Sequence, residues 1–235
     1  MPETNMNSDT FWYTDTKLSD LLKTDPAVMA KFNSRKTCKK KGEYIYLPGE
    51  RSESIFFILS GRIRLGYYKD SDREVVTAIL GEGDVFGQNS FISDEKRKDF
   101  AMASEDSEIS EFRKEELRRL MAENTDLGIY FINFLGSRIT ELEGKLESLV
   151  YQDSRSRVIS YLVNAVQKSG QRLGYEWVVR GLHTHQDIAS LTATSRQTVT
   201  MTLNELRQEQ IIDFDRKRLI VRDLSKLKNL IRENT

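Results

Sequence analysis

The sequence predicts an α+β protein in which an N-terminal antiparallel β-roll, a long helix and a C-terminal winged helix-turn-helix follow one another along 235 residues. Three observations predict this order: glycine-punctuated strand signals in the first half, an apolar stripe with a heptad repeat in the middle, and two short helix signals followed by a hairpin signal near the end. We expect domain boundaries at 1–123, 124–152 and 153–235. Hydrophobic residues make up 38% and charged residues 31%, which is typical of a globular protein.

The strand signals are concentrated between residues 42 and 87, where seven of the 13 glycines lie. Short β-branched and aromatic runs alternate with these glycines, as in an antiparallel sandwich or barrel. Before them, Leu18–Phe32 has a helical pattern, with Pro26 compatible with the first turn of its second piece. The expected strands are Tyr44–Leu47, Ile55–Leu59, Ile63–Tyr68, Val75–Leu80, Val85–Phe86, Phe100–Ala103 and Ile109–Phe112.

The apolar stripe between residues 128 and 149 keeps a 4-3-4-3-4-3 spacing with charged residues in the gaps. Three heptads of this kind predict a helix that pairs with its own copy, and an amphipathic helix lying on its own domain is the alternative. Phe131 and Phe134 form a second apolar face that is free to contact the β domain, which favours pairing. The predicted dimer interface consists of Ile132, Leu135, Ile139, Leu142, Leu146 and Leu149.

The last third of the chain carries a charge signal. Residues 155–235 have a net charge of +6, whereas residues 1–154 have a net charge of −6. A basic module joined to an acidic one indicates an anionic partner for the basic part. Asp153-Ser154-Arg155 predicts the start of a helix over Arg155–Lys168, and Trp177–Val179 predicts a short strand.

Two helices and a three-residue turn are predicted from 185 to 209. Thr184 can cap a helix over Gln186–Leu191, and Ser195 can cap a longer helix over Arg196–Gln208. The inward faces then hold Ile188, Ala189, Val199, Leu203 and Leu206. The outward residues near the start of the second helix would meet base edges in the major groove of DNA, and they are Arg196, Gln197, Thr200 and Met201.

A hairpin after the second helix predicts a wing. Ile211-Ile212 and Leu219–Val221 flank a tip that holds Arg216, Lys217 and Arg218, whose charges suit contacts with DNA phosphates. Further phosphate contacts are expected from His185, Gln186, Ser195 and Thr198. The plainer interpretation of His185 is an exposed polar residue near a helix cap, and the helix pair by itself is also common in all-α proteins.

The order of these parts resembles the bacterial cyclic-AMP receptor protein/fumarate-nitrate-reduction regulator (Crp/Fnr) family over residues 15–230. The resemblance rests on PGE at 48–50, FFILSGRIRL at 56–65, GEGDVFG at 81–87 and TSRQTVTMTLNEL at 194–206. It implies a β-roll similar to cyclic-nucleotide-binding domains that senses a small molecule, and a dimer helix that relays the state to DNA-binding heads.

The chain departs from the family where cyclic AMP would bind. Gln88 stands where cyclic-AMP-binding members have a glutamate, and Leu142 and Glu143 stand where the receptor's helix contacts adenine. Arg97 still suits an anion, so we expect the effector pocket at Gly87, Gln88, Asn89, Arg97 and Lys98. The protein then either binds an effector other than cyclic AMP or works without one. The four cysteines of the oxygen-sensing branch and the β-roll histidine of the haem-sensing branch are missing, so no cofactor is expected.

The cysteine content and the amino terminus predict a cytoplasmic protein. The single cysteine, Cys38, excludes a disulfide framework and an all-cysteine metal site within one chain, so we expect no metal. Residues 1–10 are polar, and the longest apolar run, Ile55–Leu59, is far shorter than the ~20 residues of a membrane helix. We interpret the lysine-rich segment 36–41 as a solvated loop and its thiol as silent, with a reactive thiol as the alternative.

These observations predict a homodimeric, sequence-specific transcription regulator that binds an inverted-repeat operator in double-stranded DNA. RNA polymerase and an unidentified small-molecule effector are left open as further partners. The alternative is a β-roll regulatory or interaction subunit that binds a protein or a nucleotide and does not bind DNA specifically. An enzyme is not expected, because the chain has no Gly-x-Ser-x-Gly, phosphate-loop or HExxH motif and its two histidines, His183 and His185, both lie in the basic module.

Overall fold

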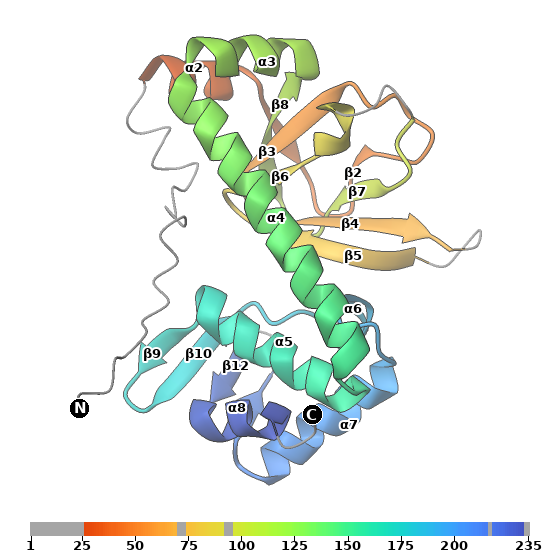
Figure 1. Ribbon diagram of the computed structural model, residues 1–235, viewed down its shortest axis with the longest axis vertical. Coiled ribbons are helices and arrows are strands. Elements are labelled where there is room, and N and C mark those ends of the chain that lie inside the picture. The colour runs from red at the N-terminus through yellow and green to blue at the C-terminus, as the bar shows by residue number, and fades with distance from the viewer. Residues whose placement is uncertain (1–25, 70–73, 92–95, 216–217, 233–235) are drawn as a thin grey trace, which may run out of the picture. The chain divides into compact units, whose positions relative to one another are not determined.

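The computed structural model describes residues 26–69, 74–91, 96–215 and 218–232 (Figure 1). The chain divides into two compact units, and the division falls after Ile139, within the long helix α4. Residues 66–78 are grouped with the second unit. Residues 26–139 are called the sensor domain below, and residues 140–232 are called the head domain.

The sensor domain contains two four-stranded sheets, with strand orders β1-β8-β3-β6 and β2-β7-β4-β5. The helix α2 (Pro26–Ser34) precedes the strands, and α3 (Lys114–Glu123) follows them. The predicted strands are all confirmed within one or two residues at each end. The strands are β1 (Lys36–Lys39), β2 (Tyr44–Tyr46), β3 (Ser54–Ser60), β4 (Ile63–Tyr68), β5 (Glu74–Leu80), β6 (Val85–Phe86), β7 (Phe100–Ala103) and β8 (Ser107–Arg113).

The core of the sensor domain is built around three aromatic side chains. The ring centroid of Phe32 lies 4.8 Å from that of Phe57 and 4.7 Å from that of Phe112, and all three side chains are fully buried. These centroid separations are within the range in which aromatic pairs contribute beyond their buried area. Together they join α2 to the central strands β3 and β8.

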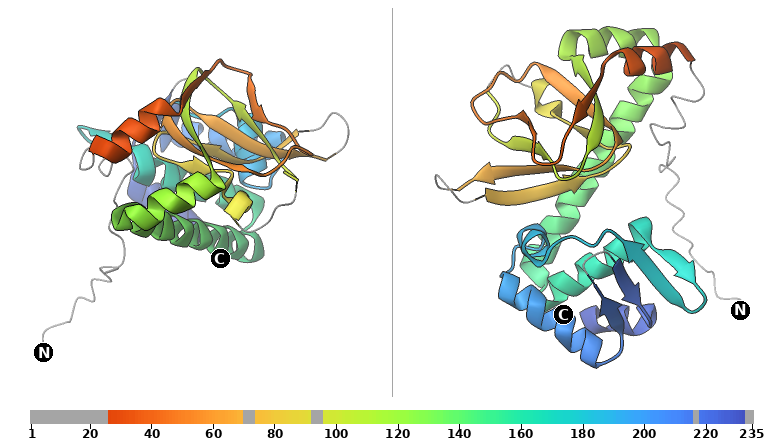
Figure 2. Two further views of the ribbon diagram at one scale, coloured as in Figure 1. Left: turned by 90° about the horizontal axis from the view of Figure 1, so that it is seen from above. Right: turned by 180° about the vertical axis from the view of Figure 1, so that it is seen from behind.

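The long helix α4 (Thr125–Tyr151) has two distinct faces. Its first turns bury Leu127, Tyr130 and Phe131 in the sensor core, and the Tyr130 hydroxyl donates to the Gly83 carbonyl oxygen at 3.0 Å. Figure 2 shows this part of the helix running along the strands of the sensor domain. The predicted second face is therefore confirmed, since Phe131 is buried and Phe134 packs against the same core.

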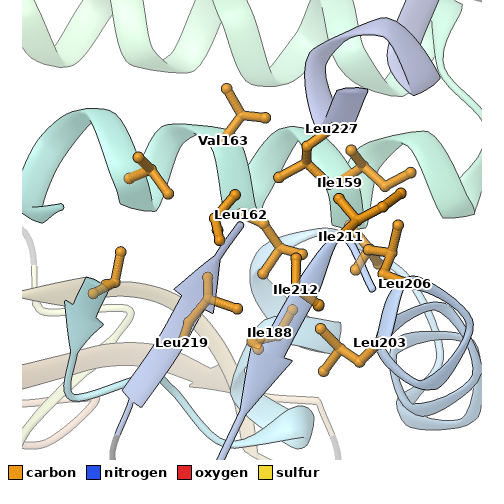
Figure 3. Close-up of a cluster of buried hydrophobic side chains, with 14 of the residues drawn as sticks. Ile159, Leu162, Val163, Ile188, Leu203, Leu206, Ile211, Ile212, Leu219 and Leu227 are labelled. Carbon is orange, nitrogen blue, oxygen red and sulfur yellow. The ribbon is translucent and has the colours of Figure 1, made fainter. Parts of the chain in front are cut away.

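The head domain contains four helices from α5 onwards and one four-stranded sheet of order β11-β12-β10-β9. Its buried side chains come from the helices and from the sheet, and they meet in one apolar cluster (Figure 3). Asp153 caps α5 by accepting from the Ser156 amide, which lowers the pKa of its carboxyl. The elements are α5 (Ser154–Ser169), β9 (Gln171–Leu173), β10 (Glu176–Arg180), α6 (His185–Leu191), α7 (Arg196–Gln208), β11 (Ile212–Phe214), β12 (Arg218–Val221) and α8 (Leu224–Arg232).

The interpretation of the lysine-rich segment 36–41 as a loop is wrong for Lys36–Lys39, which forms the edge strand β1, whereas Lys40 and Lys41 lie in the turn that follows. It pairs antiparallel with β8, and the Lys36 ammonium lies 2.6 Å from the Glu108 carboxylate. A polar, largely exposed edge strand has no apolar alternation, so its sequence gives no strand signal. Four further elements were not predicted: the 3-10 helix η1 (Gln88–Phe91), α3, β9 and α8.

Candidate functional site

The helix pair α6 and α7 is held by a side-chain cap at each amino end. The Thr184 hydroxyl accepts from the Asp187 amide, and the Ser195 hydroxyl accepts from the Thr198 amide at 3.0 Å. The five inward residues predicted from the sequence are all buried. The predicted short helix, turn and longer helix are therefore confirmed.

The turn between the two helices is clamped by one arginine of α5. The Arg157 guanidinium donates to the Thr192 carbonyl at 2.9 Å and to the Ala193 carbonyl at 3.0 Å, and it also donates to the Gln152 carbonyl at 2.7 Å. Ala193 has a φ of 50°, a left-handed conformation that is unfavourable for a residue with a Cβ atom. Sequence reasoning missed Arg157, because nothing in its local pattern distinguishes it from an exposed helix residue.

The start of α7 presents three predicted base-reading side chains to solvent. Arg196, Gln197 and Met201 are exposed, and in the described part of the chain the Arg196 guanidinium forms no ion pair. Thr200 is half-buried, and its hydroxyl donates to the Arg196 carbonyl at 2.9 Å. The same hydroxyl lies 2.9 Å from His185 Nδ1, so the methyl group is the part of Thr200 left for a base edge.

The predicted phosphate-contacting residues of α6 and α7 lie around this surface. Gln186 is exposed, whereas His185 is half-buried between α7 and the wing. The hydroxyls of Ser195 and Thr198 lie 2.8 Å apart at the start of α7. The structure thus brings all four residues to the amino ends of the helix pair.

The wing is anchored to α7 by Arg207. Its guanidinium pairs with the Asp213 carboxylate at 2.8 Å, donates to the Phe214 carbonyl, and lies 4.0 Å from the centroid of the Phe214 ring. Hydrogen bonding from the Phe214 amide, and then from Arg207, lowers the pKa of Asp213.

Arg218 does not lie at the tip of the wing, where the sequence placed it. It is the first residue of β12, and its Nε atom lies 3.0 Å from the Asp215 carboxylate. Its charge is therefore partly compensated within the hairpin. The other two predicted tip residues, Arg216 and Lys217, lie outside the described residues.

The predicted dimer stripe is exposed along α4. The exposed fraction is 69% for Ile132 and 65% for Leu146, and the other members of the stripe are also exposed in the single chain. Exposed large apolar side chains repeating along one helix face are typical of a protein–protein contact.

In the described part of the chain, no helix is long and apolar enough to cross a membrane, and no group of acidic, histidine or cysteine side chains could hold a metal ion.

Arg97, the centre of the expected effector pocket, faces inward. It is 7% exposed, donates from Nη2 to the Ser54 carbonyl at 2.6 Å, and places its guanidinium carbon 3.8 Å from the centroid of the Tyr46 ring. The Tyr46 hydroxyl lies 3.1 Å from the Asp99 carboxylate, and burial raises the pKa of both groups. The guanidinium is therefore already used to hold the sensor domain together.

The other expected pocket residues do not all gather around Arg97. Gly87 does, because a Cβ atom there would lie 3.2 Å from Arg97 Nη1 and 2.9 Å from the Ser54 carbonyl, and its φ of 80° also requires glycine. Gln88 is half-buried and Asn89 exposed, at the start of a short 3-10 helix. Lys98 is exposed, so it does not share an inward-facing anion site with Arg97.

A separate pocket of about 580 Å³ opens beside this segment. In the described part of the chain, the side chains of Lys96 and Arg113 form no ion pair there, and Ser52 is buried. The pocket is lined by Arg51, Ser52, Glu53, Lys96, Arg113, Lys114 and Glu115. Sequence reasoning missed it because its residues come from three separate segments.

Two family models match the chain, one for each domain. Residues 38–124 match the cyclic nucleotide-binding domain, and residues 156–230 match the Crp-like helix-turn-helix domain. The second match covers the helix pair, the wing and most of α8.

Relatives that match most of the chain agree with these two matches. The global nitrogen regulator of Nostoc sp. strain PCC 7120 is 29% identical over 198 residues, which cover 83% of this chain and 86% of the relative. The cyclic AMP receptor protein of Thermus thermophilus is 26% identical, over 81% of this chain and 85% of the relative. Among solved structures, a mutant of CooA from Carboxydothermus hydrogenoformans has a TM-score of 0.78 and 27% identity, over 93% of this chain and 97% of that one.

Proposed function

Because the chain belongs to the Crp/Fnr family of transcription regulators, we propose that it acts as a homodimer that binds an inverted-repeat operator and reads it with α7. The observation that carries the proposal is the start of α7, where Arg196, Gln197 and Met201 are exposed side by side behind the Ser195 cap. Side chains at this place in a helix-turn-helix reach base edges in the major groove.

Each exposed side chain suits a particular base. The Arg196 guanidinium can donate to both O6 and N7 of a guanine, and the Gln197 amide can pair with N6 and N7 of an adenine. Met201 and the Thr200 methyl group offer apolar contact to a thymine methyl. We therefore propose a half-site with one guanine and neighbouring A·T pairs. Arg216, Lys217, Arg218 and the residues at the amino ends of the helix pair supply phosphate contacts, which fix the register.

The dimer is proposed from the exposed stripe of α4. Leu142→Glu should convert dimers to monomers and abolish binding to a two-half-site duplex, because it places a charge in an apolar seam. Light scattering gives the mass, and fluorescence anisotropy gives the affinity for DNA. Thr140→Glu is the matched control, since Thr140 is exposed on the same helix but lies outside the stripe. A wild-type monomer at micromolar concentration would contradict the dimer.

For the sensor we propose an anionic effector other than cyclic AMP. Gln88 offers no carboxylate for a ribose hydroxyl, and the Arg97 guanidinium is bonded inside the domain. Lys96 and Arg113 form no ion pair with the described residues, and the pocket that they line suits a small phosphate- or carboxylate-bearing molecule. A ligand at 100 times its dissociation constant stabilises a protein by roughly 2.7 kcal/mol, so a thermal-shift screen of organic phosphates and 2-oxo acids tests the proposal. A clear shift with cyclic AMP would overturn it.

The rival function is a regulatory or interaction subunit that does not bind DNA specifically. A gel-shift assay with random duplex DNA distinguishes the two functions. A transcription regulator shifts selected duplexes, whereas a subunit that does not bind DNA specifically shifts none above background. We place the protein in the cytoplasm together with its DNA, and we include RNA polymerase as a further partner of the DNA-bound dimer.

A further inference from the structure

His185 lies where α6, α7 and the wing meet. It is the first residue of α6, its Nδ1 atom is 2.9 Å from Thr200 Oγ1 on α7, and its ring centroid is 5.9 Å from that of Phe214 on β11. It is half-buried, so part of the ring remains open to solvent beside the exposed residues of α7. The chain has only one other histidine, His183, whose Nδ1 atom lies 2.7 Å from the Tyr161 hydroxyl.

The hydrogen bonds at Thr200 determine which nitrogen of His185 carries a proton. The Thr200 hydroxyl has one proton, and it donates that proton to the Arg196 carbonyl. Its contact with His185 is then a hydrogen bond only if Nδ1–H donates and Oγ1 accepts. Nδ1 therefore stays protonated in both charge states of the ring, and Nε2 is the atom that gains or loses a proton.

We propose that His185 Nε2 binds a DNA phosphate and takes up one proton from water as the DNA binds. The inference rests on the proposed DNA-binding function and couples DNA binding to the uptake of one proton by each chain. The proton goes to a nitrogen that does not hold Thr200, so the recognition helix keeps its geometry in both charge states. A neutral Nε2 can only accept a hydrogen bond, and a phosphate oxygen needs a donor, so binding and protonation are coupled.

The charged groups around the ring favour this coupling. Burial, and then the Arg196 charge on α7, lowers the pKa of His185, which favours the neutral ring in the free protein. Asp187 on α6 accepts from the Thr184 hydroxyl at 2.7 Å, and Asp213 on β11 is paired with Arg207. Both nearby carboxylates are thus already engaged, and a phosphate is the anion that would raise the pKa of His185 in the complex.

Proton uptake by His185 should make DNA binding tighter at low pH. A group with a higher pKa in the complex favours binding at low pH, and that contribution is lost as the pH rises through the pKa of the complex. For each unit by which DNA raises the pKa, each His185 that contacts a phosphate should increase the affinity by up to tenfold between pH 8.0 and pH 5.5, and the contributions of the two copies in a dimer multiply. Because a phosphate contact is independent of sequence, a random duplex of about 30 base pairs shows it.

The test is the dissociation constant for this duplex between pH 5.5 and 8.0 at constant ionic strength, measured by fluorescence anisotropy. His185→Asn keeps a donor near the Nδ1 position but cannot titrate, so its affinity should not change with pH beyond the background set by the rest of the chain. His183→Asn is the matched control and should keep the wild-type dependence. Circular dichroism checks that both variants fold.

Each outcome decides the matter. A wild-type affinity that falls with rising pH, and a dependence lost only in His185→Asn, supports the inference. Equal pH dependence in wild type and His185→Asn overturns the inference and leaves DNA binding intact. Absence of binding at every pH overturns the proposed function itself, and the inference with it.

Discussion

The sensor and head domains place similar arginines in opposite settings. Arg97 of the sensor domain is buried, and its guanidinium is occupied by the Ser54 carbonyl and the rings of Tyr46 and Phe56. Arg196 of the head domain is exposed and forms no ion pair in the described part of the chain. Both occur in motifs that suggest an anion partner. A sequence motif thus predicts the presence of an arginine, whereas the availability of its guanidinium to a ligand depends on what the fold places against it.

The largest expected effect tests whether Arg97 is structural. Arg97→Met should reduce the free energy of unfolding of the sensor domain by about 3 kcal/mol, because it removes a charge-assisted hydrogen bond to the Ser54 carbonyl and a cation–π contact with Tyr46. Urea unfolding followed by circular dichroism measures it. Lys98→Met changes the exposed neighbour and should have little effect. Equal stability of the two variants would show that the contacts of the Arg97 guanidinium contribute nothing to the free energy of unfolding.

An intermediate effect is expected at Arg157 of the head domain. Like Arg97, it donates hydrogen bonds to backbone carbonyl oxygens within its own domain. Arg157→Gln should cost about 2 kcal/mol of stability, because the Thr192 and Ala193 carbonyls lose their donors. It should also weaken DNA binding, since the turn sets the angle between α6 and α7. Arg155→Gln, which removes only the partly exposed pair with Glu205, should cost less than 1 kcal/mol. Unchanged DNA affinity in Arg157→Gln would show that the clamp does not position α7.

The smallest expected effect on folding is at Arg196. Arg196→Ala should leave the free energy of unfolding within ~0.5 kcal/mol of wild type, because an exposed side chain without an ion pair is removed. It should weaken operator binding by about 1.5 kcal/mol and relax the preference at one base pair. Competition binding with single-base operator variants measures both. Equal weakening on every sequence would assign Arg196 to a phosphate instead of a base.

Most of the fold could be predicted because its signals are local. Thr184 and Ser195 are caps that a sequence displays directly, and the stripe from Ile132 to Leu149 follows one helical period over its whole length. The buried and exposed faces of α7 follow from the same period. The helices α4, α5, α6 and α7, which the sequence predicts, are therefore confirmed.

The rest depends on contacts between segments distant in the sequence. β1 is a strand because β8 offers it partners such as Glu108, and the polar residues of β1 do not indicate that pairing. Arg97 meets Ser54, which lies 43 residues away, and Arg157 meets Thr192, which lies 35 residues away. Side-chain contacts between residues so far apart in the sequence leave no periodic pattern in it. The burial of the Arg97 guanidinium and the hydrogen bonds from Arg157 to the turn are therefore seen only in the structure.

In-vitro selection from random duplex DNA tests whether two copies of α7 read one inverted repeat. We expect the recovered sites to contain two symmetric half-sites whose centres lie roughly one helical turn, about 34 Å, apart, each with a guanine and neighbouring A·T pairs. Recovery of a single asymmetric site, or of no enriched sequence, would contradict this expectation.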